Sequence, residues 1–302
     1  MAEPTGAERM LAPATERLGR MHRAQVHRDP WPDFSAFDPA RYEPTLRRAA
    51  AVQWAGRARA EHGSVHQFTI VAHTLCNARV PLHVLGALAR LCTDEVRHAE
   101  LCAEMALACW PEGTTQEPAV FRWEAPRAPW AMPPTGTGDL QPLLAWAAEA
   151  ILVSCCIGET LSRPMLEAIA VVATEPLADA VARQILRDEH LHATFGWETL
   201  GLLLSRLEPA ARAKLEQRMV RAFGGVEATT ACGIRVEQVA GQAIEIRRGD
   251  APNLGTLSDE QYAMIFFATM EAEVLPQLEA LGLDAWAAWR QRRVGSQGRV
   301  RA

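Results

Sequence analysis

Apolar residues recur at helical spacing over most of the chain, in segments that proline, glycine and asparagine separate. The segments between the first and second helices and between the third and fourth are short, and Pro81 and Pro176 lie in them. Such short connections indicate two antiparallel helical hairpins. The four predicted helices cover about 44–76, 82–109, 143–172 and 177–207.

Residues 111–142, between the two hairpins, contain seven prolines and three glycines and break the helical pattern. A connection of this length without regular structure is unusual inside a compact domain. It is expected, however, in a four-helix bundle in which a long crossover joins two hairpins. We therefore predict an all-α fold with such a bundle over residues 41–208, including the crossover loop 111–142.

The two ends of the chain are predicted to add to this bundle. Residues 1–40, which hold several prolines, indicate an N-terminal arm, and residues 209–302 indicate additional C-terminal helices packed on the bundle. These C-terminal helices would either complete the cover of the bundle or form the surface of a homodimer. They are expected over about 210–223, ended by Gly224–Gly225, over about 259–281, capped by Ser258, and near 286–293.

Composition changes this picture little. Of 302 residues, 49% are apolar and 6% aromatic, which permits a sizeable core and favours helices. The net charge of −5, without a long basic run, gives no reason to expect a nucleic-acid partner. The most apolar stretch, residues 143–158, is too short and, because of Glu149, too interrupted for a membrane span. Seven cysteines without Cys-x-x-Cys spacing indicate reduced thiols, and no signal peptide is visible, so we expect a cytoplasmic protein.

The candidate chemistry lies in two Glu-x-x-His motifs, Glu95–His98 and Glu189–His192. Residues three apart on a helix share one face, so the carboxylate and the imidazole of each motif can bind one metal ion. A single motif would carry little weight, because the Glu and His content of the chain produces roughly one by chance. Here both motifs extend to the longer pattern Asp-Glu-x-x-His-Ala.

Each motif also has a glutamate upstream in the preceding helix. Glu61 lies 34 residues before Glu95, Glu159 lies 30 residues before Glu189, and serine follows each upstream glutamate after three residues. This second copy of the pattern indicates a duplicated hairpin. Within each hairpin the two glutamates are nearly equidistant from the turn, and at about 1.5 Å rise per residue they reach nearly the same level. All four glutamates can therefore meet in one layer of the bundle.

Such a layer requires cations, because four carboxylates are costly to bury unpaired. Two divalent ions balance four carboxylates, and carboxylate and imidazole ligands suit iron or manganese better than structural zinc. We expect two iron ions, with a manganese–iron pair as the alternative. The competing interpretation, surface charges and unrelated core histidines, fits poorly with apolar neighbours such as Ile157 and Phe195. The predicted ligands are Glu61, Glu95, His98, Glu159, Glu189 and His192.

These six residues resemble the di-iron carboxylate proteins of the ferritin-like superfamily, in which two helices each give a glutamate and two others each give Glu-x-x-His. The similarity covers roughly residues 50–205, and Thr93–Glu100 is especially similar to the ribonucleotide reductase small subunit and its related ligand-binding oxidases. The resemblance implies a ferritin-like four-helix bundle. It also implies that Asp94 and Asp188 orient the ligand histidines by hydrogen bonds.

At two positions this chain differs from these relatives, and the differences limit which of their properties it is expected to share. The reductase subunit needs a radical tyrosine near the metals, but the two tyrosines here, Tyr42 and Tyr262, are distant from the ligands in sequence, and Ser154 replaces the tyrosine of the related oxidases. The p-aminobenzoate N-oxygenase family has an extra histidine one turn before its second motif, where this chain has Ile185. The resemblance thus implies a di-iron protein without a tyrosyl radical, and it gives no support for a seventh ligand.

Several side chains near the ligand glutamates could line a pocket for oxygen or substrate. Helical spacing places them on the faces of Glu61 and Glu159, although simple core packing would place them there as well. The candidates are Arg57, Ser64, Val65, Cys155 and Ser162.

The predicted activity is that of a non-haem di-iron oxidase or oxygenase, which activates O2 to oxidise a small organic substrate. Electrons would come from an external donor, a reductase or ferredoxin, since the chain has no flavin or dinucleotide fingerprint. Two other classes stay open. One is a ferroxidase or peroxide-scavenging protein that handles iron, and the other is a redox-inactive binding protein that the metals stabilise.

Overall fold

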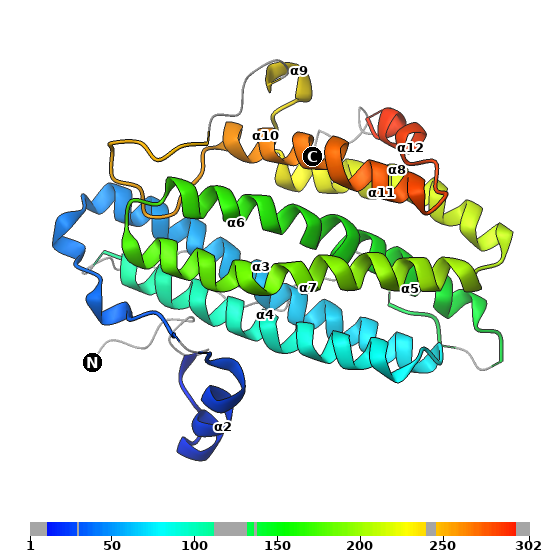
Figure 1. The fold of residues 1–302 in the computed structure, drawn as a ribbon, viewed down its shortest axis with the longest axis horizontal. Helices are drawn as coiled ribbons and strands as arrows, with labels where there is room; N and C mark the ends of the chain where they lie inside the picture. Colours follow the sequence, from blue (N-terminus) through cyan, green and yellow to red (C-terminus); the bar gives the residue numbers. More distant parts are fainter. Residues whose placement is uncertain (1–10, 29, 112–131, 136–137, 240–245, 294–302) are drawn as a thin grey trace, which may run out of the picture.

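The protein is described by a computed structural model that covers residues 11–28, 30–111, 132–135, 138–239 and 246–293. Over these residues every regular element is a helix, which confirms the all-α prediction (Figure 1). Four long helical segments run side by side and form the body of the molecule. They are α3 (Pro44–Asn77), α4 (Leu82–Cys109), the continuous segment α5–η4–α6 (Gln141–Val172) and α7 (Pro176–Arg206).

These segments are paired as the sequence predicts. Helices α3 and α4 pack along their lengths, α6 and η4 pack on α7, and the contact between α4 and α7 joins the pairs. Each observed end lies within two residues of the predicted one. The predicted crossover falls largely on residues 112–131 and 136–137, which lie outside the described part of the chain, while residues 132–135 carry no helix.

The third segment departs from a plain α-helix. Between α5 (Gln141–Ile151) and α6 (Thr160–Val172) it widens into a π-helix, η4 (Leu152–Glu159). This widened turn packs tightly on α7, where a Cβ at Gly196 would lie 2.6 Å from the Cβ of Cys155. π-Helices are rare and frequently occur at functional sites. The last residue of this one is Glu159, a predicted ligand.

Segment Gln141–Val172 is, within the described residues, long and apolar enough to cross a membrane by length and composition alone. However, 72% of its most apolar stretch is buried inside the protein, and a core helix passes the same test.

Further helices cover two sides of the four segments (Figure 1). On one side α2 (Glu16–Val26) packs on α4, and two 3-10 turns, η1 (Phe34–Ala36) and η2 (Pro39–Arg41), lead from it to α3. On the other side α8 packs on α5, and α10 packs on α6. The C-terminal elements are α8 (Pro209–Thr230), α9 (Val236–Val239), α10 (Asp259–Thr269), the π-helix η5 (Met270–Val274), α11 (Leu275–Ala280) and α12 (Ala285–Gln291).

The predicted end of the fifth helix at Gly224–Gly225 is wrong, because α8 continues to Thr230. Gly224 instead permits a close approach, since a Cβ there would lie 2.9 Å from the carbonyl oxygen of Arg292. The backbone leaves the helix at Cys232 and Gly233, whose φ angles of 52° and 78° are left-handed.

The predicted cap at Ser258 is confirmed. The Ser258 hydroxyl accepts from the backbone N–H of Gln261, and the Gln261 side chain accepts from the backbone N–H of Ser258. The helix that begins there was expected to be regular as far as residue 281, but η5 interrupts it.

Candidate metal centre

The structure brings all six predicted ligands into one interior layer. Glu61 comes from α3, Glu95 and His98 from α4, Glu159 from the end of η4, and Glu189 and His192 from α7. The two imidazole rings lie 5.4 Å apart between their centroids. Five of the six residues are buried, while the Glu61 side chain remains 18% exposed.

The six side chains fall into two groups by the carboxylate oxygens that lie within 3.8 Å of each Nδ1 atom. Ligand atoms of Glu95 and His98, and of Glu189 and His192, also lie within 4.8 Å of each other. Nδ1 of His98 lies 3.8 Å from Oε2 of Glu61 and 3.8 Å from Oε1 of Glu189. In the other group, Nδ1 of His192 lies 3.0 Å from Oε1 of Glu95 and 3.3 Å from Oε2 of Glu159. Each group therefore combines one imidazole with two carboxylates and draws on both hairpins.

Unpaired polar atoms in this layer fit bound cations. Both carboxylate oxygens of Glu95, Oε2 of Glu189, Nδ1 of His98 and Nε2 of His192 are buried without a hydrogen-bond partner. Most buried polar atoms in proteins are hydrogen-bonded, so five such atoms among the six ligands need another explanation. Carboxylate oxygens and imidazole nitrogens are the ligands that iron and manganese accept, so the donor set suits a pair of these ions.

The protonation of the metal-free layer leads to the same conclusion. Burial and the nearby Glu159 carboxylate raise the pKa of both Glu95 and Glu189 well above the ordinary value. Burial alone would lower the pKa of His192, but the adjacent carboxylates of Asp94, Glu159 and Glu95 outweigh it and raise that pKa. Without metal, protons must therefore supply the positive charge that the layer requires.

Two aspartates hold the outer sides of the imidazoles. Nε2 of His98 lies 3.3 Å from Oδ2 of Asp188, and Nε2 of His192 lies 3.6 Å from Oδ2 of Asp94. The arrangement is crossed, because Asp188 belongs to α7 and His98 to α4, whereas Asp94 belongs to α4 and His192 to α7. Both Nδ1 atoms are thereby directed toward the glutamates, which is the orientation that metal binding needs.

Three arginines surround this aspartate pair, and none of them was a predicted site residue. Nη1 of the buried Arg97 lies 2.8 Å from Asp94 and 2.5 Å from Asp188. Arg28 bridges the same two carboxylates at 3.2 Å and 2.7 Å, and Arg90 lies 2.8 Å from Asp94. Burial alone would raise the pKa of Asp94, but the nearby His192 and the hydrogen bonds from Arg90 and Arg97 hold it at about 2. The aspartates therefore remain ionised.

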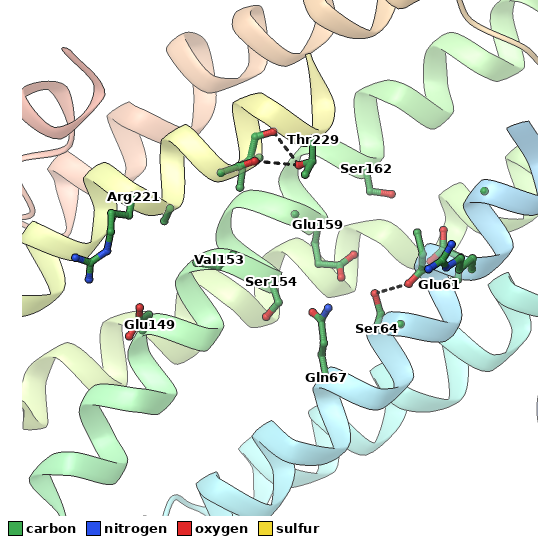
Figure 2. A pocket seen from close by; sticks show the side chains of 18 of the residues that line it. Glu61, Ser64, Gln67, Glu149, Val153, Ser154, Glu159, Ser162, Arg221 and Thr229 are labelled. Carbon is green, nitrogen blue, oxygen red and sulfur yellow. Dashed lines mark hydrogen bonds between the residues drawn. The ribbon is translucent and has the colours of Figure 1, made fainter. Parts of the chain in front are cut away.

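An open cavity of about 1200 Å³ adjoins the ligand layer (Figure 2). Glu61 and Glu159 direct their carboxylates into it, from α3 and from η4. The predicted pocket residues Ser64 and Ser162 lie in its wall. Further lining residues, none of which was predicted to line a pocket, are Gln67 on α3, Ser154 and Gly158 on η4, and Arg221 and Thr229 on α8.

The other three predicted pocket residues lie elsewhere. Arg57 donates to the carbonyl oxygen of Gly255 and to the Tyr262 hydroxyl, and so fastens the loop before α10. Val65 lines a separate cavity beside α2. Cys155 is fully buried, and because burial raises its pKa it stays a protonated thiol rather than a thiolate.

Comparison with known proteins assigns no family. No protein-family model, curated protein or solved structure matches this chain. The interpretation of the centre therefore rests on its ligands, their burial and their hydrogen bonds.

Proposed function

We propose that this chain is a ferritin-like, non-haem di-iron protein that activates O2 to oxidise a small organic substrate. The observation that carries the proposal is the two-group layer of four glutamates and two histidines, with unpaired buried oxygens and with both Nδ1 atoms directed inward. Two helices that each give a glutamate and two that each give Glu-x-x-His are the arrangement of di-iron carboxylate bundles.

The two groups would each hold one ion. His98 with Glu61 and Glu189 would bind the first, and His192 with Glu95 and Glu159 would bind the second. When bound, a pair of iron ions supplies the electrons and the Lewis acidity that oxygen activation requires. Four carboxylates neutralise two divalent ions, which removes the cost of burying the charges.

The remaining residues of the site position and shield these groups. Asp94 and Asp188 hold the ring orientation of the two histidines, and the arginines around them keep both carboxylates ionised. Ile157 and Phe195, which are buried and close to the ligands in sequence, would help to exclude water from the layer. Substrate would enter through the cavity in which Glu61 and Glu159 lie, whose volume suits a small molecule.

The cavity is the observation that favours an oxidase or oxygenase over iron handling, because a protein that oxidises only Fe(II) needs no organic pocket. Its lining provides hydroxyl and amide groups from Ser64, Ser162 and Gln67, which could orient a polar group of a substrate. We propose an external reductase or ferredoxin as the electron donor.

The test is anaerobic reconstitution with Fe(II), followed by exposure to O2. We expect two iron ions per chain and oxygen uptake, and we expect both to be lost in Glu95→Gln/Glu189→Gln. The matched control is Glu167→Gln, an exposed glutamate on α6 paired with Arg163. Failure of the wild type to retain iron or manganese would overturn the proposal.

The same experiment separates the alternatives. Repeated turnover of added Fe(II) without any organic reductant would indicate a ferroxidase. Stable metal with no oxygen uptake would indicate a binding protein that the metals only stabilise. Retention of manganese in one group during mixed-metal loading would indicate the manganese–iron pair.

A further inference from the structure

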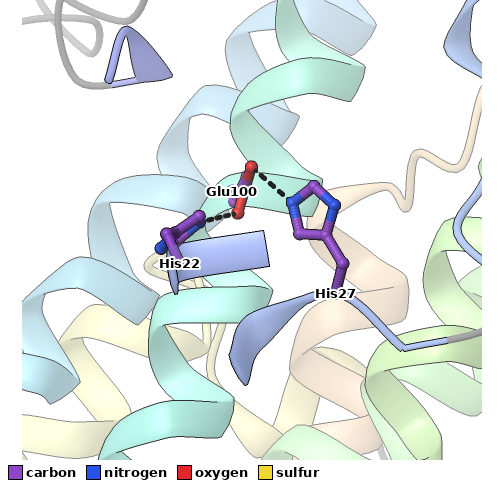
Figure 3. Close-up of side chains that lie close together, drawn as sticks. All are labelled: His22, His27 and Glu100. Atoms are coloured by element: carbon purple, nitrogen blue, oxygen red, sulfur yellow. Dashed lines mark hydrogen bonds and ion pairs between the residues drawn. The ribbon is translucent and has the colours of Figure 1, made fainter. Parts of the chain in front are cut away.

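A second cluster of metal-binding side chains lies outside the six-ligand layer, where α2 meets α4 (Figure 3). Nε2 of His22 lies 2.7 Å from Oε2 of Glu100, and Nε2 of His27 lies 2.9 Å from Oε1 of the same carboxylate. One ligand atom from each of the three residues falls within 4.8 Å of the other two. Two imidazoles thus converge on one carboxylate, although the histidines and the glutamate are more than 70 residues apart.

The two imidazoles are held by separate parts of the N-terminal segment. The His27 ring stacks on Trp31, with 3.8 Å between centroids and 6° between planes. His22 lies one turn earlier, within α2, and its ring meets that of His27 edge-on at 5.8 Å. The two Nε2 atoms consequently reach the two oxygens of the Glu100 carboxylate from different directions.

The surroundings of the cluster favour a cation. The three residues line a cavity of about 580 Å³, in which Glu104, one turn after Glu100 on α4, adds a second carboxylate, and His62 adds a third imidazole from α3. Burial raises the pKa of Glu104 to about 7, and repulsion by the neighbouring Glu100 carboxylate adds to this effect. Arg23 also lines this cavity, and its positive charge offsets part of the attraction that the carboxylates exert on a cation.

We propose that His22, His27 and Glu100 form a site for one divalent transition-metal ion, and that zinc is the ion it fits best. Two imidazoles and one carboxylate are the ligand set of many zinc sites, in which a fourth position is left open. With zinc bonds of about 2.0–2.1 Å, ligand atoms of a tetrahedral site lie roughly 3.3 Å apart. The present N···O distances reach that value by small side-chain rotations, which the half-exposed His22 allows.

Zinc at this site would fasten the N-terminal segment to the bundle. The segment continues from His27 directly to Arg28, whose guanidinium bridges Asp94 and Asp188. The Nε atom of Arg97 also donates to the carbonyl oxygen of Val26, at the end of α2. The zinc ion would therefore hold in place the segment around His27 and Arg28, which covers the aspartate pair. This holds whichever metal the six-ligand layer binds.

The test is the number of zinc ions that the metal-free protein takes up, measured by equilibrium dialysis and elemental analysis. If the six-ligand layer also binds zinc, the wild type takes up three ions per chain, and if it does not, one. In either case His22→Gln/His27→Gln should bind one ion fewer. His83→Gln, which removes an exposed histidine at the start of α4, is the matched control and should bind as the wild type does.

Equal zinc counts in the wild type and the double variant would overturn the proposal. A second measurement does not depend on any variant. An anomalous-scattering map of wild-type crystals soaked in zinc should show a peak between His22, His27 and Glu100, and a clear map without that peak would also overturn it. Glu95→Gln/Glu189→Gln should keep this peak, so failure of the di-iron proposal is distinguishable from failure of this one.

Discussion

Nε2 of His98, on α4, lies 3.3 Å from Oδ2 of Asp188, on α7. Asp188 stands directly before the ligand Glu189 in sequence, yet the histidine it supports belongs to the other hairpin. In the same way Asp94, on α4, lies beside His192, on α7. A change at either aspartate should consequently affect a ligand on the neighbouring helix.

Asp188→Asn is expected to weaken metal binding about 10–100-fold, because the amide no longer fixes the orientation and basicity of the His98 ring. Competition with a coloured chelator would measure the affinity. Asp179→Asn, on the same helix but paired with the exposed Arg183, should bind metal as the wild type does. Unchanged affinity in Asp188→Asn would show that the hydrogen bond has no role in binding.

Gly196→Ala is expected to destabilise the protein by about 1–3 kcal/mol, because the new methyl group would meet the Cβ and the backbone of Cys155 at 2.6–2.9 Å. The displaced π-helix carries Glu159, so metal affinity should fall as well. Gly201→Ala on the same helix meets only Leu281 at 3.5 Å and should be neutral or stabilising. Urea unfolding and metal titration of both variants provide the comparison.

Glu104→Gln is expected to stabilise the metal-free protein at alkaline pH. Burial and Glu100 raise the folded pKa of Glu104 to about 7, above its ordinary value, so its favourable contribution is lost as the pH rises toward 7. Glutamine stays neutral and avoids that loss. In the presence of chelator, the variant should gain about 1 kcal/mol over the wild type near pH 8, after allowance for solvent screening, and little near pH 5. An equal difference in stability between the variant and the wild type at both pH values would contradict the raised pKa of Glu104.

Gly158→Leu is expected to fill part of the large cavity without removing a ligand. Gly158 lies in the cavity wall, and a Cβ there makes only an ordinary contact with the carbonyl oxygen of Val153, at 3.5 Å. Iron content should stay that of the wild type, while binding of azide to the iron-loaded protein should weaken. A fall in iron content equal to the fall in azide binding would instead indicate that the substitution disturbs Glu159.

The helices and the ligand layer could be predicted because both depend on local periodicity. Prolines and short turns set the helix ends, and the equal distances of Glu61 and Glu95 from their turn place both at one level. The π-helix at Leu152–Glu159 could not be predicted in this way, since the same apolar sequence fits an α-helix. It packs closely against Gly196 of α7, a contact between distant residues that no local pattern records.

Contacts between distant parts of the chain also could not be predicted from the sequence. Arg28 lies 160 residues from Asp188, and it comes from a proline-bearing segment in which helical periodicity gives little register. Gly224 was interpreted as a helix end because glycine is common there, whereas its function is to admit the Arg292 carbonyl. The ligands themselves could therefore be predicted from the sequence. The residues that support them could not, because only the folded chain brings them together.

Each half of the duplicated pattern carries only part of either ligand group. The α3–α4 hairpin gives Glu61 and His98 to one group but only Glu95 to the other, and the second hairpin supplies the complementary residues. Within the second hairpin, however, Glu159, Glu189 and His192 also lie close enough to hold one ion, so a fragment with this hairpin should retain at most one. Uptake of the second ion should thus act as a reporter of assembly, appearing only when the two halves of the chain have packed together.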